Sequence, residues 1–461
     1  MKIIKILIVI LVIYFMKNFI ISRIPLRGIV EGFYGNPWTF EDRVDLLKFS
    51  REYKLNAYIY APKDDPYHRE KWREPYPDIK IQEFKKLIKI AKFNKVRFIF
   101  AVSPGLDLSY NGEKGNEDFN FLMAKLDSIY KVGCRDFAIF FDDIKEDLDS
   151  GKNQAYFLNK VQEALKIKYS NINPLITVPT EYYLKSMIDD EGNIKQYTKN
   201  FTSILNKDII VLYTGDKVVP DGISEESFKK ALEIYKRDLG IWWNYPVNDF
   251  LRAKLALGPI EKLPTSNITS IFFNPMEQFQ LSKIALATGA EYSYSPQKYD
   301  ANISWDRVLK YQFKKIAPAM KVFASHSRHM ENSWASIGPS DGPEFYEEAH
   351  QVVINANSSK KVDFSKLNKL INEMENSANI LLKYLPPKIL AECKLQIEQF
   401  KRIIKADRVA IKSLQDKKFV YELISMKHNI SLYENEAIIS EKSALKFIDE
   451  VIDLLNGQNN E

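Results

Sequence analysis

Cysteine and histidine are scarce in this chain of 461 residues, which has two cysteines and five histidines. Neither Cys134 nor Cys393 stands at metal-ligand spacing from another cysteine or a histidine, and two cysteines make no disulfide framework. We therefore expect both thiols to be free and structural, and we expect no metal and no other cofactor. His68 follows several acidic residues, but no second histidine lies at ligand spacing, so metal-dependent hydrolysis is a weak alternative.

A large surplus of either positive or negative charge is also missing. Lysine and arginine together number 66 and aspartate and glutamate 60, and the resulting net charge of +6 is spread over the chain. Without a basic block, binding to nucleic acid is not expected. The hydrophobic share of 45% and the aromatic share of 13% exclude a disordered or fibrous chain and allow a sizeable core.

Long apolar runs are absent except near the amino terminus, where a short basic start precedes an apolar run over residues 6–16. This run is short for a membrane span and typical of a signal-peptide core, yet no small-residue cleavage site follows it. We expect residues 1–23 to be a signal peptide or a membrane anchor, which would place the rest of the chain outside the cytoplasm. A buried amino-terminal strand is the alternative.

From residue 27 onward, short segments rich in β-branched and aromatic residues alternate with longer segments of helical periodicity. This alternation predicts an α/β fold, a (β/α)8 TIM barrel of eight strands and eight helices over residues 24–303. The predicted strands are Arg27–Val30, Leu55–Tyr60, Val96–Val102, Asp136–Phe141, Leu175–Val178, Ile209–Tyr213, Gly240–Trp243 and Ile268–Phe273. The predicted helices include Thr39–Tyr53, Ile81–Phe93, Glu117–Tyr130, Ala155–Lys168, Glu225–Arg237 and Glu277–Ala287.

Strand patterns stop at about residue 304, and apolar spacings of three and four continue to the end of the chain. They predict an α-helical bundle domain over residues 304–461, without a catalytic constellation of its own. Its helical segments are Trp305–Ser327, Phe345–Ala356, Phe364–Tyr384, Pro387–Leu414 and Lys417–Leu455. The sequence leaves the role of this domain and the oligomeric state open.

Two consecutive carboxylates, Asp142 and Asp143, end the fourth predicted strand. Two like charges are not buried side by side without a strong penalty, so we expect both at the open carboxyl end of the strand. Their repulsion and partial desolvation are expected to raise at least one pKa, giving one protonated and one ionised acid. Glycoside hydrolysis needs this division, although a cap or a metal site is another use of such a pair.

Adjacent acids do not suit ordinary double displacement, in which nucleophile and acid stand roughly 5 Å apart on different sides of the sugar. Neighbouring side chains of one strand seldom meet that requirement. Both acids can act if the substrate's own 2-acetamido carbonyl is the nucleophile, with one acid orienting the amide and the other transferring the leaving-group proton.

Seven motifs follow the predicted strands in order. They are Gly28-Ile-Val-Glu-Gly-Phe-Tyr-Gly35-x-Pro37-Trp38, Tyr60-Ala-Pro-Lys63-Asp64-Asp65, Ser103-Pro-Gly-x-Asp107, Phe141-Asp-Asp143, Pro179-Thr-Glu-Tyr182, Trp242-x-Asn244-x4-Asp249 and Phe273-Asn274-Pro275. Together they resemble glycoside hydrolase family 84, the O-GlcNAcases and related bacterial hexosaminidases, sometimes labelled hyaluronidases. The resemblance covers residues 25–299, in the family's order, and is more specific than any single motif.

The resemblance implies a retaining β-N-acetylglucosaminidase that acts on glycoproteins or glycans through an oxazoline intermediate. It implies that Asp142 orients the acetamido nitrogen and that Asp143 is first the general acid and then the general base. The residues that it assigns to sugar binding are Gly32, Lys63, Tyr182, Trp242, Asn244, Asp249 and Asn274.

Each of these residues has a simpler structural explanation when it is taken alone. A glycine can serve a tight turn, a lysine beside acids can form a surface ion pair, and aromatic residues can fill a core. Asparagine and aspartate can form turns and helix caps. Joint placement after different strands of one barrel favours a single pocket instead.

Two other functions remain open at this level. One is an inactive, membrane-tethered sugar-binding protein, against which the intact pair of aspartates speaks. The other is an endo-acting hyaluronidase, which is disfavoured because the hydroxyl-binding residues implied by the resemblance would enclose a terminal sugar. The natural aglycone is not specified by the sequence.

Overall fold

The computed structural model describes residues 23–145, 149–358 and 362–457. The expected signal peptide or anchor lies outside these residues, apart from residue 23. None of the helices in the described ranges has the length and apolar character that crossing a membrane requires.

Eight parallel strands close into a barrel in sequence order, with β8 paired to β1. The predicted TIM barrel is confirmed, and every predicted strand boundary lies within two residues of the observed one. The strands are β1 Leu26–Glu31, β2 Ala57–Tyr60, β3 Arg97–Val102, β4 Asp136–Phe140, β5 Ile176–Val178, β6 Ile210–Tyr213, β7 Leu239–Trp243 and β8 Ser270–Phe273.

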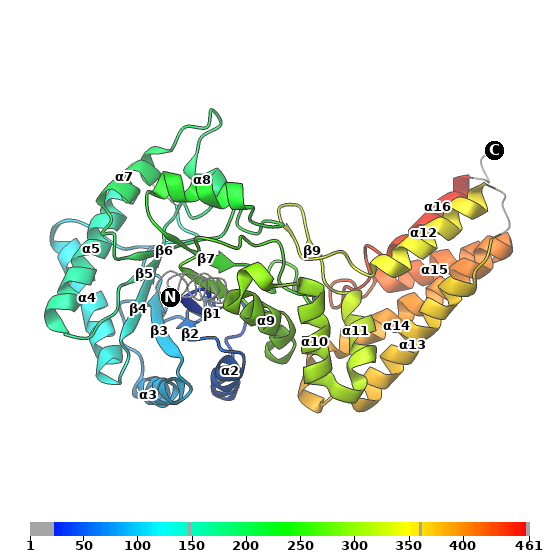
Figure 1. The fold of residues 1–461 in the computed structure, drawn as a ribbon, viewed down its shortest axis with the longest axis horizontal. Helices are drawn as coiled ribbons and strands as arrows, with labels where there is room; N and C mark the ends of the chain where they lie inside the picture. The colour runs from blue at the N-terminus through cyan, green and yellow to red at the C-terminus, as the bar shows by residue number, and fades with distance from the viewer. Residues whose placement is uncertain (1–22, 146–148, 359–361, 458–461) are drawn as a thin grey trace, which may run out of the picture.

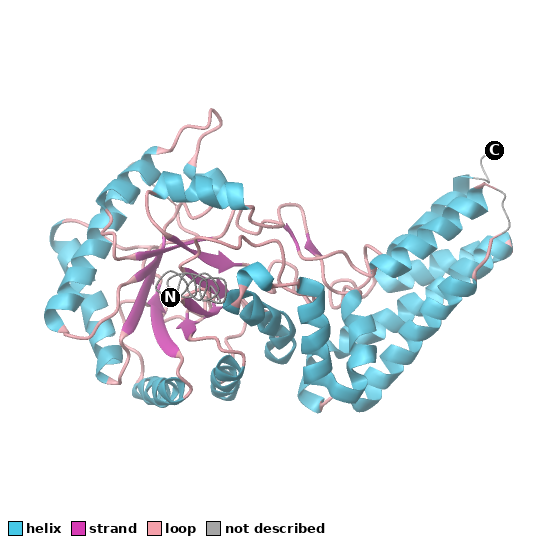
Figure 2. Cartoon of the chain, in the orientation of Figure 1, coloured by secondary structure: helices cyan, strands magenta, loops and turns pink. Residues whose placement is uncertain are grey.

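Helices surround the strands on the outside of the barrel (Figure 2). A capping box begins helix α2, because the Thr39 hydroxyl accepts a hydrogen bond from the Asp42 amide at 3.1 Å and the Asp42 carboxylate accepts from the Thr39 amide at 3.3 Å. The helices of this part are α2 Phe40–Glu52, α3 Asp78–Phe93, α4 Gly112–Lys131, α5 Ser150–Lys168, α6 Leu184–Met187, α7 Gln196–Ile204, α8 Glu225–Tyr235, α9 Phe279–Tyr294 and η1 Pro296–Lys298.

The expectation of eight helices is wrong at one place, because residues 244–269, between β7 and β8, form a loop without a helix. Pro246, Pro259 and Pro264 lie in this segment, and proline both lacks an amide hydrogen and clashes with a helical backbone. The long loop instead carries polar residues across the carboxyl end of the barrel.

The inside of the barrel is packed with apolar side chains rather than hollow. Val30, Ile59, Ala101 and Phe140 belong to one buried cluster to which all eight strands contribute. The ring of Trp242, near the end of β7, meets Phe140 edge-on with centroids 5.5 Å apart. This packed interior forms a rigid floor beneath the carboxyl ends of the strands.

Helices dominate the region after the barrel, which lies to one side of it (Figure 1). The elements are α10 Ala301–Phe313, η2 Lys314–Ile316, α11 Ala317–Ser325, β9 Met330–Glu331, β10 Ser336–Ile337, α12 Pro343–Asn357, α13 Ser365–Tyr384, α14 Pro387–Gln415, η3 Lys417–Phe419, α15 Val420–Ser431 and α16 Ala444–Gly457. The hairpin of β9 and β10 corrects the expectation that strands stop at residue 304. Helix α10 crosses that residue, so the domain division stays a prediction. Both cysteines are buried and unpaired, as expected.

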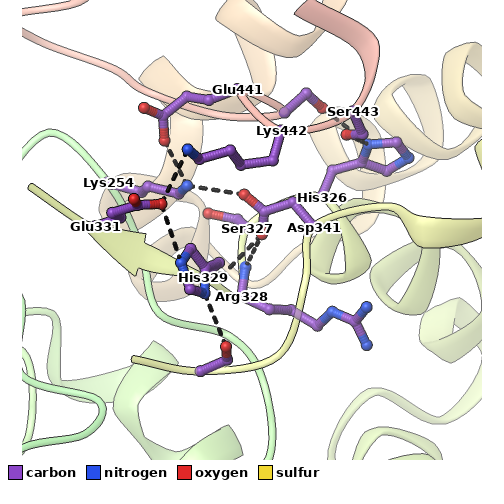
Figure 3. A network of polar contacts seen from close by, with 12 residues as sticks. Lys254, His326, Ser327, Arg328, His329, Glu331, Asp341, Glu441, Lys442 and Ser443 are labelled. Atoms are coloured by element: carbon purple, nitrogen blue, oxygen red, sulfur yellow. Dashed lines mark hydrogen bonds and ion pairs between the residues drawn. The ribbon is translucent and has the colours of Figure 1, made fainter. Parts of the chain in front are cut away.

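A buried polar network joins the barrel to the region that follows it (Figure 3). Lys254, from the loop after β7, donates to Asp341 at 2.8 Å and also pairs with Glu441. Asp341 accepts hydrogen bonds from the backbone amides of Arg328 and His329 at 2.6 and 2.9 Å. Since these residues flank the β9–β10 hairpin, the network holds the base of the hairpin against the barrel.

Candidate active site

A cavity of about 420 Å³ opens at the carboxyl ends of the barrel strands. It is lined by every residue that the sequence assigned to catalysis or sugar binding. These residues are Gly32 after β1, Lys63 after β2, Asp142 and Asp143 after β4, Tyr182 after β5, Trp242 and Asn244 at the end of β7, Asp249 in the β7–β8 loop, and Asn274 after β8. Their side chains or backbones converge because the same ends of all eight parallel strands meet there.

Asp142 is nearly buried and forms an ion pair with Lys63, whose own side chain is 3% exposed. Lys63 therefore does not form the surface ion pair with Asp64 or Asp65 that its neighbours suggested. Burial disfavours the charged amine, but the carboxylates of Asp142 and Asp143 more than offset this and raise the pKa of Lys63. The other carboxyl oxygen of Asp142, Oδ1, has no hydrogen-bond partner among the described residues.

Asp143 is more open, with its side chain 38% exposed, and lies 3.8 Å from the Lys63 ammonium. Tyr34 donates a hydrogen bond to one of its carboxyl oxygens at 2.8 Å and Tyr182 donates to the other at 3.1 Å. The backbone of Asp143 has a φ of 55°, in the left-handed region that L-residues rarely adopt. This turn directly follows Asp142 at the end of β4.

Repulsion between Asp142 and Asp143 was expected to raise the pKa of at least one of them, but the pKa of Asp143 is lowered. Burial disfavours the ionised carboxyl, yet the pKa of Asp143 lies below its usual value because the charge of Lys63 and several smaller contributions together outweigh that penalty. Hydrogen bonds from Tyr34 and Tyr182 act in the same direction. The sequence indicated the repulsion between the neighbouring aspartates. It did not indicate that the ammonium group of Lys63, which follows β2, would lie beside them.

A network of amide groups connects β1, β7 and β8 at the floor of the cavity. The side-chain oxygen of Asn244 accepts from the Trp242 indole at 2.8 Å and from the Asn274 amide at 3.0 Å. Asn274 in turn accepts from the Gly32 backbone amide at 3.3 Å. These residues therefore do more than form turns, because they fix one another's orientation around the cavity.

Asp249 does not cap a helix. Its carboxylate accepts a hydrogen bond from the backbone amide of Tyr34 at 2.9 Å and so joins the β7–β8 loop to the loop after β1. Burial raises the pKa of Asp249, and this outweighs the hydrogen bond from Tyr34. The cavity therefore contains carboxyl groups whose pKa values are shifted in opposite directions.

The sequence interpretation missed several residues of the cavity wall. Tyr34 lies inside the first motif but was not assigned a role, and Thr214 follows β6 in the same way as the assigned residues follow their strands. Phe250 and Trp334 form an aromatic pair with ring centroids 5.3 Å apart. Trp334 comes from the β9–β10 hairpin, so no strand-end pattern of the barrel could have indicated it.

Comparison with known protein families shows to which family the chain with this barrel and cavity belongs. A family model described as beta-N-acetylglucosaminidase matches residues 27–325, which is the barrel and the first helices after it. The chain belongs to this family. A second model, described as hyaluronidase post-catalytic domain-like, matches residues 347–448 of the helical region.

Relatives of this β-N-acetylglucosaminidase family member include the protein O-GlcNAcases of Rattus norvegicus and Mus musculus. Each is 33% identical over 283 residues, which is 59% of this chain and 30% of the relative. The chain thus spans about a third of the length of these relatives.

Solved structures agree over most of the chain. CpGH84B is 38% identical, with a TM-score of 0.87 over 92% of this chain and 76% of that one. A variant of the Thermobaculum terrenum O-GlcNAc hydrolase is 27% identical, with a TM-score of 0.80 over 95% of this chain and 97% of that one. These matches, with the family model, place the chain among the family 84 glycoside hydrolases.

The remaining candidate from the sequence, His68, lies outside the cavity wall. Its ring contacts the carbonyl oxygen of Ala101 at 2.8 Å and the hydroxyl of Ser103 at 3.1 Å. Burial lowers the pKa of His68 to about 4, so the ring is neutral near pH 7. No group of three or more metal-ligating side chains gathers within the described ranges. His68 instead attaches the β2–α3 loop to the end of β3.

Proposed function

We propose that this protein removes terminal β-linked N-acetylglucosamine from glycoproteins or glycans, with retention of configuration and with the substrate's acetamido group as the nucleophile. The family membership supports the sugar and the reaction class. The mechanism rests on one observation, which is that two adjacent carboxylates, Asp142 and Asp143, contact one lysine at the mouth of a cavity that encloses a sugar-sized space.

Asp142 is suited to orient the acetamido nitrogen. Its Oδ1 atom has no partner among the described residues, and an unpaired buried oxygen of a carboxylate is costly unless a donor arrives. An N–H of a bound sugar would be such a donor. A hydrogen bond there would strengthen as the carbonyl oxygen attacks the anomeric carbon, because positive charge then develops on the nitrogen.

Asp143 is suited to transfer protons in both steps. As the anomeric carbon–oxygen bond breaks, it would give a proton to the leaving oxygen, and it would later take a proton from the water that opens the oxazoline. Its low pKa in the free site opposes the first role. Tyr182 can remove this obstacle when substrate binds. Its hydroxyl donates to Asp143 in the free site and, in our proposal, donates to the acetamido oxygen in the complex. Loss of that hydrogen bond would raise the pKa of Asp143.

The test compares 4-nitrophenyl β-N-acetylglucosaminide with the matching β-glucoside, which lacks the acetamide. We expect release from the first substrate and a loss of at least about 100-fold on the second. Proton NMR of the first-formed sugar should show the β-anomer. Equal rates on both substrates, or an initial α-anomer, would exclude the proposed mechanism.

Variants of the pair separate the two roles. Asp142→Asn and Asp143→Asn should each reduce turnover by about 100-fold or more, whereas the exposed Asp208→Asn should not. Asp143→Asn should be least harmful with a dinitrophenyl leaving group, which needs little protonation. No activity of the wild type over a range of pH, combined with measurable sugar binding, would favour the inactive binding protein.

The substrate and the location of the protein are separate predictions. Shortening of hyaluronan without release of a monosaccharide would favour the endo-acting alternative. The expected extracytoplasmic location rests on residues 1–23, of which only residue 23 lies within the described structure, and stays a prediction that amino-terminal sequencing of the mature protein can test.

A further inference from the structure

Arg69 and Tyr34 form a chain of hydrogen bonds that ends on Asp143. The Arg69 guanidinium donates to the Tyr34 hydroxyl at 2.6 Å, and that hydroxyl donates to Asp143 Oδ2 at 2.8 Å. A second nitrogen of Arg69 donates to the backbone carbonyl of Asp143 at 3.3 Å. Arg69 therefore contacts both the backbone of Asp143 and, through Tyr34, its carboxylate.

We propose that Arg69 and Tyr34 are positioning residues that hold Asp143 ionised and in one orientation, and so assist the second step, in which Asp143 takes a proton from water. This inference rests on the proposed function, because it assigns Asp143 the role of general base in that step.

The geometry dictates the direction of the Tyr34 proton. A phenol oxygen carries one hydrogen and accepts through its lone pairs, so an arginine N–H on the oxygen leaves the phenol hydrogen to point elsewhere. The nearby acceptor is the Asp143 carboxylate. Burial is the main cause that raises the pKa of Tyr34, so the phenol remains a donor over the working pH range.

The position of Arg69 is fixed by contacts of its neighbour His68 with the end of β3. Its neighbour His68 is buried, and the His68 backbone carbonyl accepts from the Ser103 amide at 2.9 Å while its ring contacts the Ser103 hydroxyl. The turn that carries Arg69 is therefore attached to the end of β3. A half-buried arginine on a fixed turn can hold a neighbouring hydroxyl more precisely than a side chain on a free loop.

The backbone of Asp143 gives a second reason for the contact. Its left-handed conformation is unfavourable for a residue with a side chain, and a hydrogen bond to its carbonyl supports that conformation. Arg69 thus stabilises the left-handed turn at Asp143.

Other groups also face Asp143 and define the background of the test. They are the cations Lys63 and Arg69, the hydroxyls of Tyr34 and Tyr182, and the carboxyls of Asp142 and Asp249. Because substrate would draw the Tyr182 hydroxyl to its own acetamido oxygen, Tyr34 would be the hydroxyl that stays on Asp143 throughout the cycle.

The experiment measures pH profiles of the full-length enzyme with Tyr34→Phe. Loss of a donor to the carboxylate should raise the apparent pKa of Asp143 by about one unit. The acid limb of kcat on a dinitrophenyl substrate, where the second step limits, should move to higher pH. The alkaline limb of kcat/KM on an alkyl glycoside, where protonated Asp143 is needed, should move in the same direction.

Arg69→Met should move both limbs the same way, and the double variant should move them no further than Arg69→Met alone. Arg69→Lys keeps a cation but lacks the second donor arm, so it should restore only part of the shift. Tyr311→Phe is the matched control, since its hydroxyl also donates to a carboxylate, Glu52, but far from the cavity. This control should leave both limbs in place.

The outcomes distinguish the two levels of the argument. A wild type without activity on any aryl N-acetylglucosaminide contradicts the proposed function itself. An active wild type whose limbs stay at the same pH in Tyr34→Phe, even with reduced turnover, overturns the positioning role. Additive shifts in the double variant would also overturn it, because they would show that Tyr34 acts on Asp143 independently of Arg69.

Discussion

At the scale of single residues, the need for glycine at position 32 comes from a neighbouring ring and not from backbone conformation. A Cβ atom at Gly32 would lie 2.4 Å from Cζ2 of Trp242, far inside van der Waals contact. The ring of Trp242 forms part of the cavity wall and its indole nitrogen donates to Asn244. A side chain at position 32 must therefore displace a wall of the proposed sugar site.

Gly32→Ala should fold but lose about 10- to 100-fold in kcat/KM on the aryl substrate, since small displacements near the reacting groups are costly. Trp242→Phe removes the ring atoms that collide with the new methyl group. The double variant should therefore lose less than the sum of the two single losses, expressed as free energies. Strict additivity would show that the two residues act independently.

His326, which directly follows α11, is buried beside two serine hydroxyls and carries a prediction about acid stability. Its Nδ1 atom lies 3.0 Å from Ser443 Oγ and 2.9 Å from Ser440 Oγ. Burial lowers the pKa of His326 from 6.5 to about 4. Between these pH values the unfolded chain binds a proton at this residue and the folded chain does not.

Stability should therefore fall as the pH drops from 6.5 towards 4, and this residue should account for about 3 kcal/mol of the loss once the pH is below 4. Urea unfolding of the wild type and His326→Gln at several pH values measures the effect. The variant should show a smaller loss over the same range. Parallel pH dependences in the two proteins would contradict the assignment.

At the scale of elements, the sequence predicted what depends on local pattern and strand order. The barrel strands are short apolar runs, and parallel strands gather the polar residues that follow them, so Asp142, Lys63 and Asn274 could be placed at one end. Eight helices were expected from the regular repeat of strands and helices, but the segment between β7 and β8 contains three prolines and forms a loop without a helix. The β9–β10 hairpin has strands of two residues each, which are too short to show a period.

Contacts between side chains from different elements were beyond the reach of the sequence. Lys63 and Asp142 are separated by 79 positions and form an ion pair. The charge of this lysine also helps to lower the pKa of Asp143. The bond from Arg69 to Tyr34 likewise depends on the directions of two loops. The residue types and the strand ends were predictable, whereas the sign of a pKa shift required the distances.

Trp334 of the β9–β10 hairpin is expected to contribute to substrate binding. It is 50% exposed and packs against Phe250 at the cavity. An aromatic face at this position can contact the part of the substrate beyond the cleaved bond. Trp334→Ala should weaken kcat/KM about three- to tenfold for a glycopeptide or disaccharide, and less for methyl β-N-acetylglucosaminide. Tyr384→Ala, an exposed aromatic on α13, is the control. Equal losses on both substrates would show that Trp334 does not contact the aglycone.

At the scale of the whole molecule, the helical region and the barrel are joined by specific buried contacts. Glu392 of α14 accepts hydrogen bonds from the backbone amides of Gln280 and Leu281, both at 2.9 Å, at the amino-terminal end of α9. The network of Lys254, Asp341 and Glu441 forms a second connection (Figure 3). Because Asp341 also binds the base of the hairpin, the second connection links the helical region to the cavity.

Lys254 is the cation on which this second connection depends. Burial alone would lower the pKa of Lys254, but the charges of Asp341 and Glu441 outweigh burial and raise it. Both Lys254 and Asp341 are essentially inaccessible, with side-chain exposures of 1% and 0%. Removing the lysine would leave a carboxylate buried without a counter-charge, which is far more costly than breaking a surface pair.

Lys254→Met should therefore lower the free energy of unfolding by about 3–5 kcal/mol, and Lys254→Met with Asp341→Asn should lose less than the sum of the single losses. Lys262 lies in the same loop as Lys254 and forms an exposed pair with Asp221, so Lys262→Met should cost about 1 kcal/mol or less. Urea unfolding measures stability, and kcat/KM on an extended glycopeptide reports the position of the hairpin. If Lys254→Met loses stability but keeps full activity on that substrate, the network holds the two regions together without orienting Trp334.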